Sequence, residues 1–207
     1  PGRLLTVGGY TYPFIERMLL RSTLPYVSML LIFTYGFTAE GALVPLNDDE
    51  GLVRIARSMG SLPYLVLAPL TAGRKFDSNL ITTVLRDDQA RLKLIREIFA
   101  VMEEKGYQGL NLDFEYVPAE DAEVFVSFAQ ELSQLLNAAG YGFNIALAPK
   151  YYAEQSGLLY AGHDYYGLGQ AADTVLLMTY EWGYTYGPPM AVAPINEVRK
   201  VVQYALT

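Results

Sequence analysis

The chain has 207 residues, of which 52% are hydrophobic and 18% are charged, and its formal net charge is −7. This length and apolar fraction are sufficient for one globular domain with an ordinary core, and they argue against a disordered chain. The acidic balance argues against nucleic acid as a partner, because such partners need a basic face. The longest apolar runs, such as 26–37, stop well short of the roughly 18 to 20 residues of a bilayer span, so we expect none.

The composition also limits the kinds of site that can form. There is no cysteine and a single histidine, His163, so neither a disulfide nor a zinc site is expected. We interpret His163 as a residue that holds a loop. The chain begins at Pro1, which we interpret as an excerpt or a processed form, with any signal peptide outside it.

Short apolar runs alternate with amphipathic stretches along the chain. This alternation is typical of repeated βα units around a parallel sheet. Near-continuous apolar character suits strands that are covered on both faces. The six predicted strands are 4–10, 27–35, 63–69, 109–116, 142–149 and 174–180.

Amphipathic periodicity predicts three helices. In the first, Leu92 belongs to an apolar stripe with three- and four-residue spacing, Asp87 stands at the N-cap and Gly106 follows the end. In the second, Leu135 belongs to the corresponding stripe and Gly140 lies just beyond the end. The predicted helices are 88–104, 119–139 and 194–205.

Six βα units fit either an open doubly wound sheet or most of an eightfold barrel, which typically has about 250 residues. Gly8 and Gly9 are adjacent and lack the spacing of a dinucleotide-binding loop. A cluster of polar residues at the end of the fourth predicted strand favours the barrel instead. We therefore predict an α/β fold of the (β/α)8 TIM-barrel type, one domain over residues 1–207, truncated to about six βα units with its C-terminal strands missing.

The predicted strand 109–116 carries the candidate chemistry. Alternate side chains of a strand point to opposite faces, so Asn111, Asp113 and Glu115 share one face, which in a barrel is the interior. Burying two carboxylates there is costly unless they are paired or used. Repulsion and desolvation should raise the pKa of one of them, as a general acid requires, and Glu115 is the better candidate. The competing interpretation is an exposed strand with a solvated charged face.

The segment 107–115 resembles the active-site signature of glycoside hydrolase family 18, the chitinase-like barrels. That signature reads Asp-x-x-Asp-x-Asp-x-Glu. Asp113 and Glu115 match its last two acidic positions, whereas Gln108 and Asn111 stand at its first two.

Later segments are similar to the bacterial spore-cortex-lytic members of the same family. In one of them, Glu181 stands where many chitinases have Asp. The similarity extends over essentially the whole chain, and the two main motifs fall at the fourth and sixth predicted strands. The similar segments are 162–165, 178–184 and 187–189.

The resemblance implies a retaining mechanism in which the substrate supplies its own nucleophile. Glu115 would protonate the glycosidic oxygen and later act as base toward water. Asp113 would orient the 2-acetamido group of the sugar and offset its developing positive charge, and Tyr180 would hydrogen-bond the acetamido carbonyl. Because carboxyl groups, a tyrosine and the substrate's own amide are sufficient for this chemistry, we expect no metal and no organic cofactor. The substrate-binding candidates are Asn111, which would hold Asp113 from below, Met178 at the pocket floor, Glu181 beside Tyr180, Trp182 and Tyr10.

Independently of the resemblance, Met178, Tyr180 and Trp182 alternate onto one face of the sixth predicted strand, although plain packing of an aromatic strand end is the alternative.

We therefore expect a glycosidase acting on a polysaccharide that contains N-acetylglucosamine. The expected substrate is peptidoglycan, with spore cortex as one source, and the expected location is extracellular, at the cell wall or spore of a bacterium. Two alternatives remain open: a chitinase proper, and a non-catalytic module that binds chitin or peptidoglycan on the same fold. The intact pair of Asp113 and Glu115 favours the enzyme.

Overall fold

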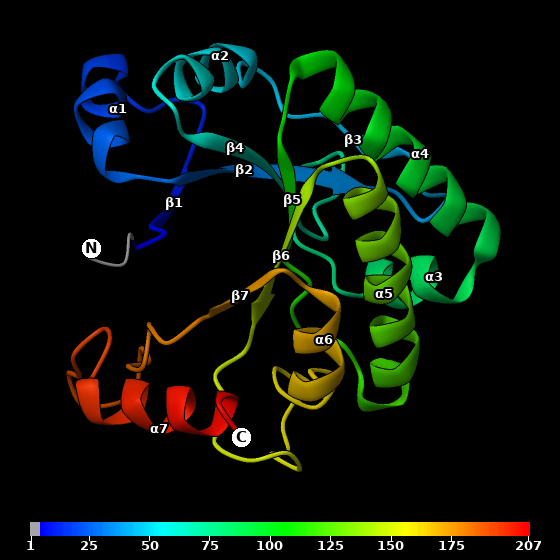
Figure 1. Ribbon diagram of the computed structural model, residues 1–207. Helices are drawn as coiled ribbons and strands as arrows, with labels where there is room; N and C mark the ends of the chain where they lie inside the picture. Colours follow the sequence, from blue (N-terminus) through cyan, green and yellow to red (C-terminus); the bar gives the residue numbers. More distant parts are fainter. Residues whose placement is uncertain (1–4) are drawn as a thin grey trace.

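The computed structural model describes residues 5–207. One parallel sheet curves into half of a barrel, and helices cover its outer side (Figure 1). Its strands follow one another in chain order with no reversal, which is the order of a βα barrel and not of a doubly wound sheet. The parallel strands are β1 (Gly8–Thr11), β2 (Met29–Phe37), β4 (Leu62–Leu67), β5 (Gly109–Leu112), β6 (Gly142–Leu147) and β7 (Thr174–Leu177).

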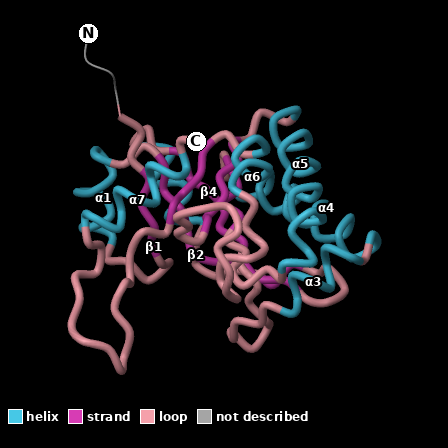
Figure 2. The backbone as a smooth tube through the Cα atoms, turned by 90° about the horizontal axis from the view of Figure 1, so that it is seen from below, coloured by secondary structure: helices cyan, strands magenta, loops and turns pink. Residues whose placement is uncertain are grey.

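A short strand, β3 (Leu43–Val44), pairs antiparallel with β2 outside this path. In Figure 2 the strands lie in the middle, between α1 and α7 on one flank and α3 to α6 on the other. No helix in the described part of the chain is both long and apolar enough to span a membrane. The helices are α1 (Arg17–Thr23), α2 (Glu50–Ser58), α3 (Asn79–Arg86), α4 (Asp88–Lys105), α5 (Ala122–Ala138), α6 (Tyr165–Ala171) and α7 (Ile195–Ala205), with 3₁₀ turns at Leu24–Tyr26 and Ala119–Asp121.

All six predicted strands are present in the predicted order, but the third to sixth end earlier than expected, the fourth and sixth most of all. β5 ends at Leu112 and β7 at Leu177, so the candidate site residues that follow them lie in loops. The last ladder hydrogen bond beyond β5 runs from Asp113 N to Leu67 O, at 2.9 Å. Past this bond the chain turns away, and Tyr116 has a φ of 58°. The first predicted strand begins at Leu4, which lies outside the described residues.

The predicted helix ends are confirmed at α4. The Asp87 carboxylate accepts hydrogen bonds from the backbone N–H groups of Gln89 and Ala90, which satisfies two of the four free donors of the first turn. Gly106 has a φ of 80° and closes the helix in the left-handed conformation that favours glycine. The second predicted helix begins as a 3₁₀ turn and continues as α5, while α1, α2, α3 and α6 were not predicted.

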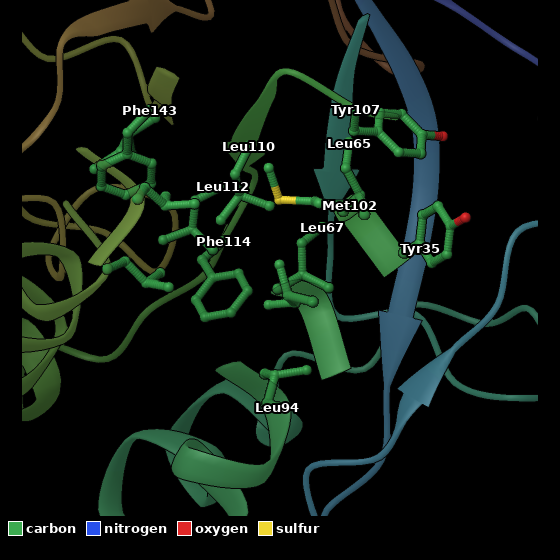
Figure 3. Close-up of a cluster of buried hydrophobic side chains, with 14 of the residues drawn as sticks. Tyr35, Leu65, Leu67, Leu94, Met102, Tyr107, Leu110, Leu112, Phe114 and Phe143 are labelled. Carbon is green, nitrogen blue, oxygen red and sulfur yellow. The ribbon is translucent and has the colours of Figure 1, made fainter. Parts of the chain in front are cut away.

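One strip of each long helix packs on the outer face of the sheet. Leu110, Leu112 and Phe114 point into this layer and are fully buried (Figure 3). Phe114 stacks against Phe125 and Phe128 of α5, with ring centroids 5.8 and 6.1 Å apart. The covered face of the predicted strand 109–116 is therefore confirmed, and Phe114 anchors the chain between Asp113 and Glu115 in the core.

Two residues of the predicted apolar stripes were placed wrongly. Leu92 of α4 is 44% exposed and Leu135 of α5 is 43% exposed. Ile95 and Met102 of the predicted α4 stripe are buried as expected, but Leu94 and Ile98, which the stripe omitted, are fully buried in place of Leu92. The periodicity of apolar residues leaves the edges of the buried face undefined, and only the position of the sheet decides which edge residues are covered.

The two leucines of α4 give a matched test of this assignment. Leu94→Ala should lower the free energy of unfolding by about 2–5 kcal/mol, because Leu94 is fully buried in the core and its truncation leaves a cavity there. Leu92→Ala, the control, should change it by less than about 0.5 kcal/mol. Urea unfolding of both variants measures the difference, and equal losses would contradict the observed face of α4.

Candidate active site

A cavity of about 590 Å³ opens at the carboxyl ends of the strands. This end of a βα barrel is where the loops that follow each strand converge. Seven of the eight predicted site residues line the cavity, so segments more than 160 residues apart in the sequence meet there. They are Tyr10, Asp113, Glu115, Met178, Tyr180, Glu181 and Trp182.

Asp113 is the most deeply placed ionisable group of the cavity wall. Its side chain is buried, and its Oδ1 atom has no hydrogen-bond partner within the described residues. Burial raises the pKa of Asp113 to about 7, and the charge of Glu115 acts in the same direction. The Asp113 carboxyl group is therefore poised to hold or release a proton near neutral pH.

Glu115 lies closer to the mouth and is partly buried. Burial raises its pKa, and the negative charge of Glu181 raises it further. The sequence led us to expect a raised pKa at one of the two carboxyl groups, whereas the pKa values of both are raised. The reason is that each is desolvated and each has an acidic neighbour.

The Tyr180 hydroxyl belongs to the same group of interacting side chains. Burial, followed by the charges of Asp113 and Glu115, raises the pKa of Tyr180 to about 12. The phenol therefore keeps its proton near neutral pH and is available as a hydrogen-bond donor. The hydrogen-bond donor Tyr180, the partly buried Glu115 and the buried Asp113 thus line one cavity.

A row of hydrogen bonds crosses the barrel interior and includes the fully buried Asn111. The Tyr10 hydroxyl donates to Asn111 Oδ1 at 3.0 Å, and Asn111 Nδ2 donates to Asn144 Oδ1. Asn144 Nδ2 in turn donates to Thr174 Oγ1 at 2.8 Å. This row links β1, β5, β6 and β7.

The same row explains a difference from expectation. Asn111 was expected to hold Asp113 from below, but its side-chain amide is already bonded to Tyr10 and Asn144. Asn144 was not predicted. The sequence feature that could have identified Asn144 is its polarity within the otherwise apolar run 142–147. In the sheet, Asn144 pairs in register with Asn111.

The segment that follows β7 is a loop and not the predicted strand. Glu181 has a φ of 59°, and this turn brings Glu181 into the cavity wall together with Met178, Tyr180 and Trp182. Trp182 Nε1 donates to the Tyr151 hydroxyl at 3.2 Å. Trp182 is thereby fixed to the loop that follows β6.

A second cavity, of about 500 Å³, lies on the other side of the same carboxyl groups. Phe76 and Tyr116 form part of its wall, and both are more than half exposed. Asp113 and Glu115 line both cavities. The arrangement suits an extended ligand that passes over the two carboxyl groups.

Residues 70–205 match the sequence profile of Glycosyl hydrolases family 18. Among curated proteins, the cortical fragment-lytic enzyme of Bacillus subtilis (strain 168) is 36% identical over 189 residues, which cover 90% of this chain and 43% of that protein. Among solved structures, the spore cortex-lytic enzyme SleL of Bacillus cereus aligns with a TM-score of 0.90 and 31% identity, over 97% of this chain and 47% of that chain.

A chitinase from Chromobacterium violaceum aligns with a TM-score of 0.87 and 19% identity, over 98% of this chain and 64% of that chain, a likeness of fold alone. The chain spans less than half the length of the two spore-related proteins that it matches.

The raised pKa of Asp113 has a consequence for stability. Between its ordinary value of 3.8 and about 7, the folded protein keeps a proton that the unfolded chain has lost, so stability falls as the pH rises through this window. Asp113→Asn cannot titrate and should gain stability relative to the unchanged protein as the pH rises from 4 to 8. Each unit of pKa elevation corresponds to about 1.4 kcal/mol.

Urea unfolding at pH 4, 6 and 8 measures this gain. A difference between the two proteins that stays constant over the range would mean that Asp113 is not held protonated by the fold.

Proposed function

This chain belongs to family 18 of the glycosyl hydrolases, and on that premise we propose that it cleaves a polysaccharide containing N-acetylglucosamine, with Glu115 as the acid/base catalyst. The observation that carries this proposal is the pair of carboxyl groups with raised pKa, Asp113 and Glu115, in one cavity wall. A general acid must be protonated near the working pH, and a raised pKa provides that condition. The proposed reaction uses only side chains of this site, the amide of the substrate and one water molecule.

In the first step the Glu115 carboxyl group donates its proton to the glycosidic oxygen. The bond from the anomeric carbon to that oxygen breaks, and its electron pair stays with the leaving sugar. The carbonyl oxygen of the 2-acetamido group bonds to the anomeric carbon from the opposite face and forms an oxazolinium ring. This route is a known exception to hydrolysis with an enzyme nucleophile.

In the second step the Glu115 carboxylate removes a proton from water. The water oxygen attacks the anomeric carbon, and the ring opens as the carbonyl oxygen leaves. Two inversions at this carbon give net retention. During this cycle Asp113 accepts a hydrogen bond from the acetamido N–H and offsets the positive charge of the ring. Such electrostatic stabilisation is most effective in a site sheltered from water.

The proposed substrate is peptidoglycan, and specifically the cortex of bacterial spores. Support comes from the printed names of the relatives, a cortical fragment-lytic enzyme and a spore cortex-lytic enzyme. The two cavities on either side of Asp113 and Glu115 suit a polymer better than a single sugar. The corresponding location is outside the cytoplasm, at the spore or cell wall.

Two other functions are separable by experiment. A chitinase proper would use the same residues on a polymer of N-acetylglucosamine alone. A binding module would use the cavity without turnover. Release of reducing ends is measured with cortex peptidoglycan and with chitin oligosaccharides, for the protein and for Glu115→Gln.

Product with N-acetylglucosamine at its reducing end, absent with Glu115→Gln, is the expected result for cortex peptidoglycan. Product from chitin oligosaccharides only would identify a chitinase. No turnover by the unchanged protein, with equal glycan binding by both forms, would overturn the catalytic proposal.

Tyr180→Phe tests the proposed donor to the acetamido carbonyl. Removal of a hydrogen bond that stabilises a developing charge should lower kcat about 10²- to 10³-fold. Tyr184→Phe is the matched control, since Tyr184 is 70% exposed and lies outside the cavity wall. Steady-state kinetics on the same substrate compare the two, and equal rates for both variants would remove Tyr180 from the mechanism.

A further inference from the structure

The backbone carbonyl between Asp113 and Glu115 is held by a histidine from a distant loop. His163 Nε2 lies 2.8 Å from the carbonyl oxygen of Phe114. The other ring nitrogen, Nδ1, accepts a hydrogen bond from the backbone N–H of Ala148, also at 2.8 Å. One imidazole ring therefore joins the ends of β5 and β6.

The partners of His163 determine its protonation. A backbone N–H can only donate, so Nδ1 carries no proton, and a carbonyl oxygen can only accept, so Nε2 carries one. The ring is fully buried, and its burial lowers the pKa of His163 to about 4. His163 is accordingly a neutral imidazole that accepts from Ala148 at Nδ1 and donates to Phe114 at Nε2. It is not a source of protons for the reaction.

The loop of His163 is pressed closely against the chain that follows Glu115. A Cβ atom on Gly162 would lie 2.3 Å from the carbonyl oxygen of Val117, which only glycine permits. The Tyr165 hydroxyl donates to the carbonyl oxygen of Ala148, and it accepts from the N–H of Lys150 at 2.9 Å. We call residues 162–165, with these contacts, the His163 clamp.

The position of this bridge matters because the sheet no longer holds the chain there. The ladder of β5 makes its last hydrogen bond at Asp113 N, and the chain then turns at Tyr116 with a φ of 58°. Phe114 is fixed on its outer side by ring packing (Figure 3). The Nε2–H bond to its carbonyl fixes the remaining freedom, which is rotation of the peptide unit that precedes Glu115.

We propose that His163 is a positioning residue, which sets the direction of the Asp113 and Glu115 side chains through the carbonyl of Phe114. This inference rests on the proposed function, since those two groups perform the reaction. The Nε2–H bond carries the positioning, whereas the Nδ1 bond only ties the clamp to β6.

Two substitutions separate the ring nitrogens. In His163→Gln the side-chain amide reaches the position of Nε2 and can still donate to Phe114. In His163→Asn the shorter amide reaches the position of Nδ1 and can still accept from Ala148. Tyr165→Phe is the control, because it weakens the same clamp without touching Phe114.

We expect kcat to fall in His163→Asn and to change little in the other two variants. His163→Asn should lower kcat roughly 10- to 100-fold, as small misplacements of catalytic groups do, with KM within about twofold. His163→Gln and Tyr165→Phe should keep kcat within about threefold even where thermal unfolding shows a comparable loss of Tm. Losses of kcat that follow Tm in all three variants would overturn the proposal and leave His163 a purely structural residue.

A second readout does not depend on turnover. The carboxyl carbon of Asp113 can be titrated by ¹³C NMR in the unchanged protein and in each variant. A pKa of Asp113 that moves in His163→Asn but not in His163→Gln supports the proposal, and one that moves in neither overturns it.

The same assays include Glu115→Gln as the baseline for hydrolysis. If the unchanged protein does not exceed this baseline, the proposed function fails, while the carboxyl titration still decides whether His163 positions Asp113. The chain has one histidine, so ¹⁵N NMR reports its tautomer without ambiguity, and a proton on Nδ1 would contradict the bridge.

Discussion

Desolvation of two carboxyl groups at the end of one strand is the constraint on which the rest of the site depends. Asp113 and Glu115 share a face of the chain and the wall of one cavity, and burial raises the pKa of both. Such burial is unfavourable unless the groups are used or paired. Oδ1 of Asp113 has no hydrogen-bond partner in the part of the chain that the structure describes. The acetamido N–H of the proposed substrate would supply this hydrogen bond and lower the free-energy cost of burying the carboxyl group. The reactivity of the site and its cost in stability therefore have the same origin.

The surroundings keep these two groups in place from three directions. Phe114 packs into the helix layer behind them, and the row from Tyr10 through Asn111 to Asn144 fills the barrel interior beneath them. His163 bonds the carbonyl between them. Rigid support of this kind suits the roles that we propose for these two groups, because proton transfer from Glu115 and the interaction of Asp113 with the acetamido group both depend steeply on distance and angle.

Much of this arrangement was predictable from the sequence, because core residues and site residues alternate along β5 and the segment that follows it. Leu112 and Phe114 identify the covered face, and Asp113 and Glu115 identify the other. The contacts of Asn144 and His163 were not predictable, since they join residues 33 and 49 positions apart and depend on the curvature of the sheet. The exposure of Leu92 was missed for a related reason: helical periodicity defines the centre of a buried face, but the neighbouring elements decide which residues at its edge are covered.

The stereochemistry of hydrolysis tests the central claim most directly, namely that Glu115 acts as acid and base while the acetamido group of the substrate is the nucleophile. ¹H NMR can follow the anomeric proton of the first product released from a β-linked N-acetylglucosamine oligosaccharide, before the two anomers equilibrate. Retention through an oxazolinium ring predicts that the β-anomer forms first. Initial formation of the α-anomer would show direct attack by water, and it would contradict both the role of the acetamido group and the second role of Glu115.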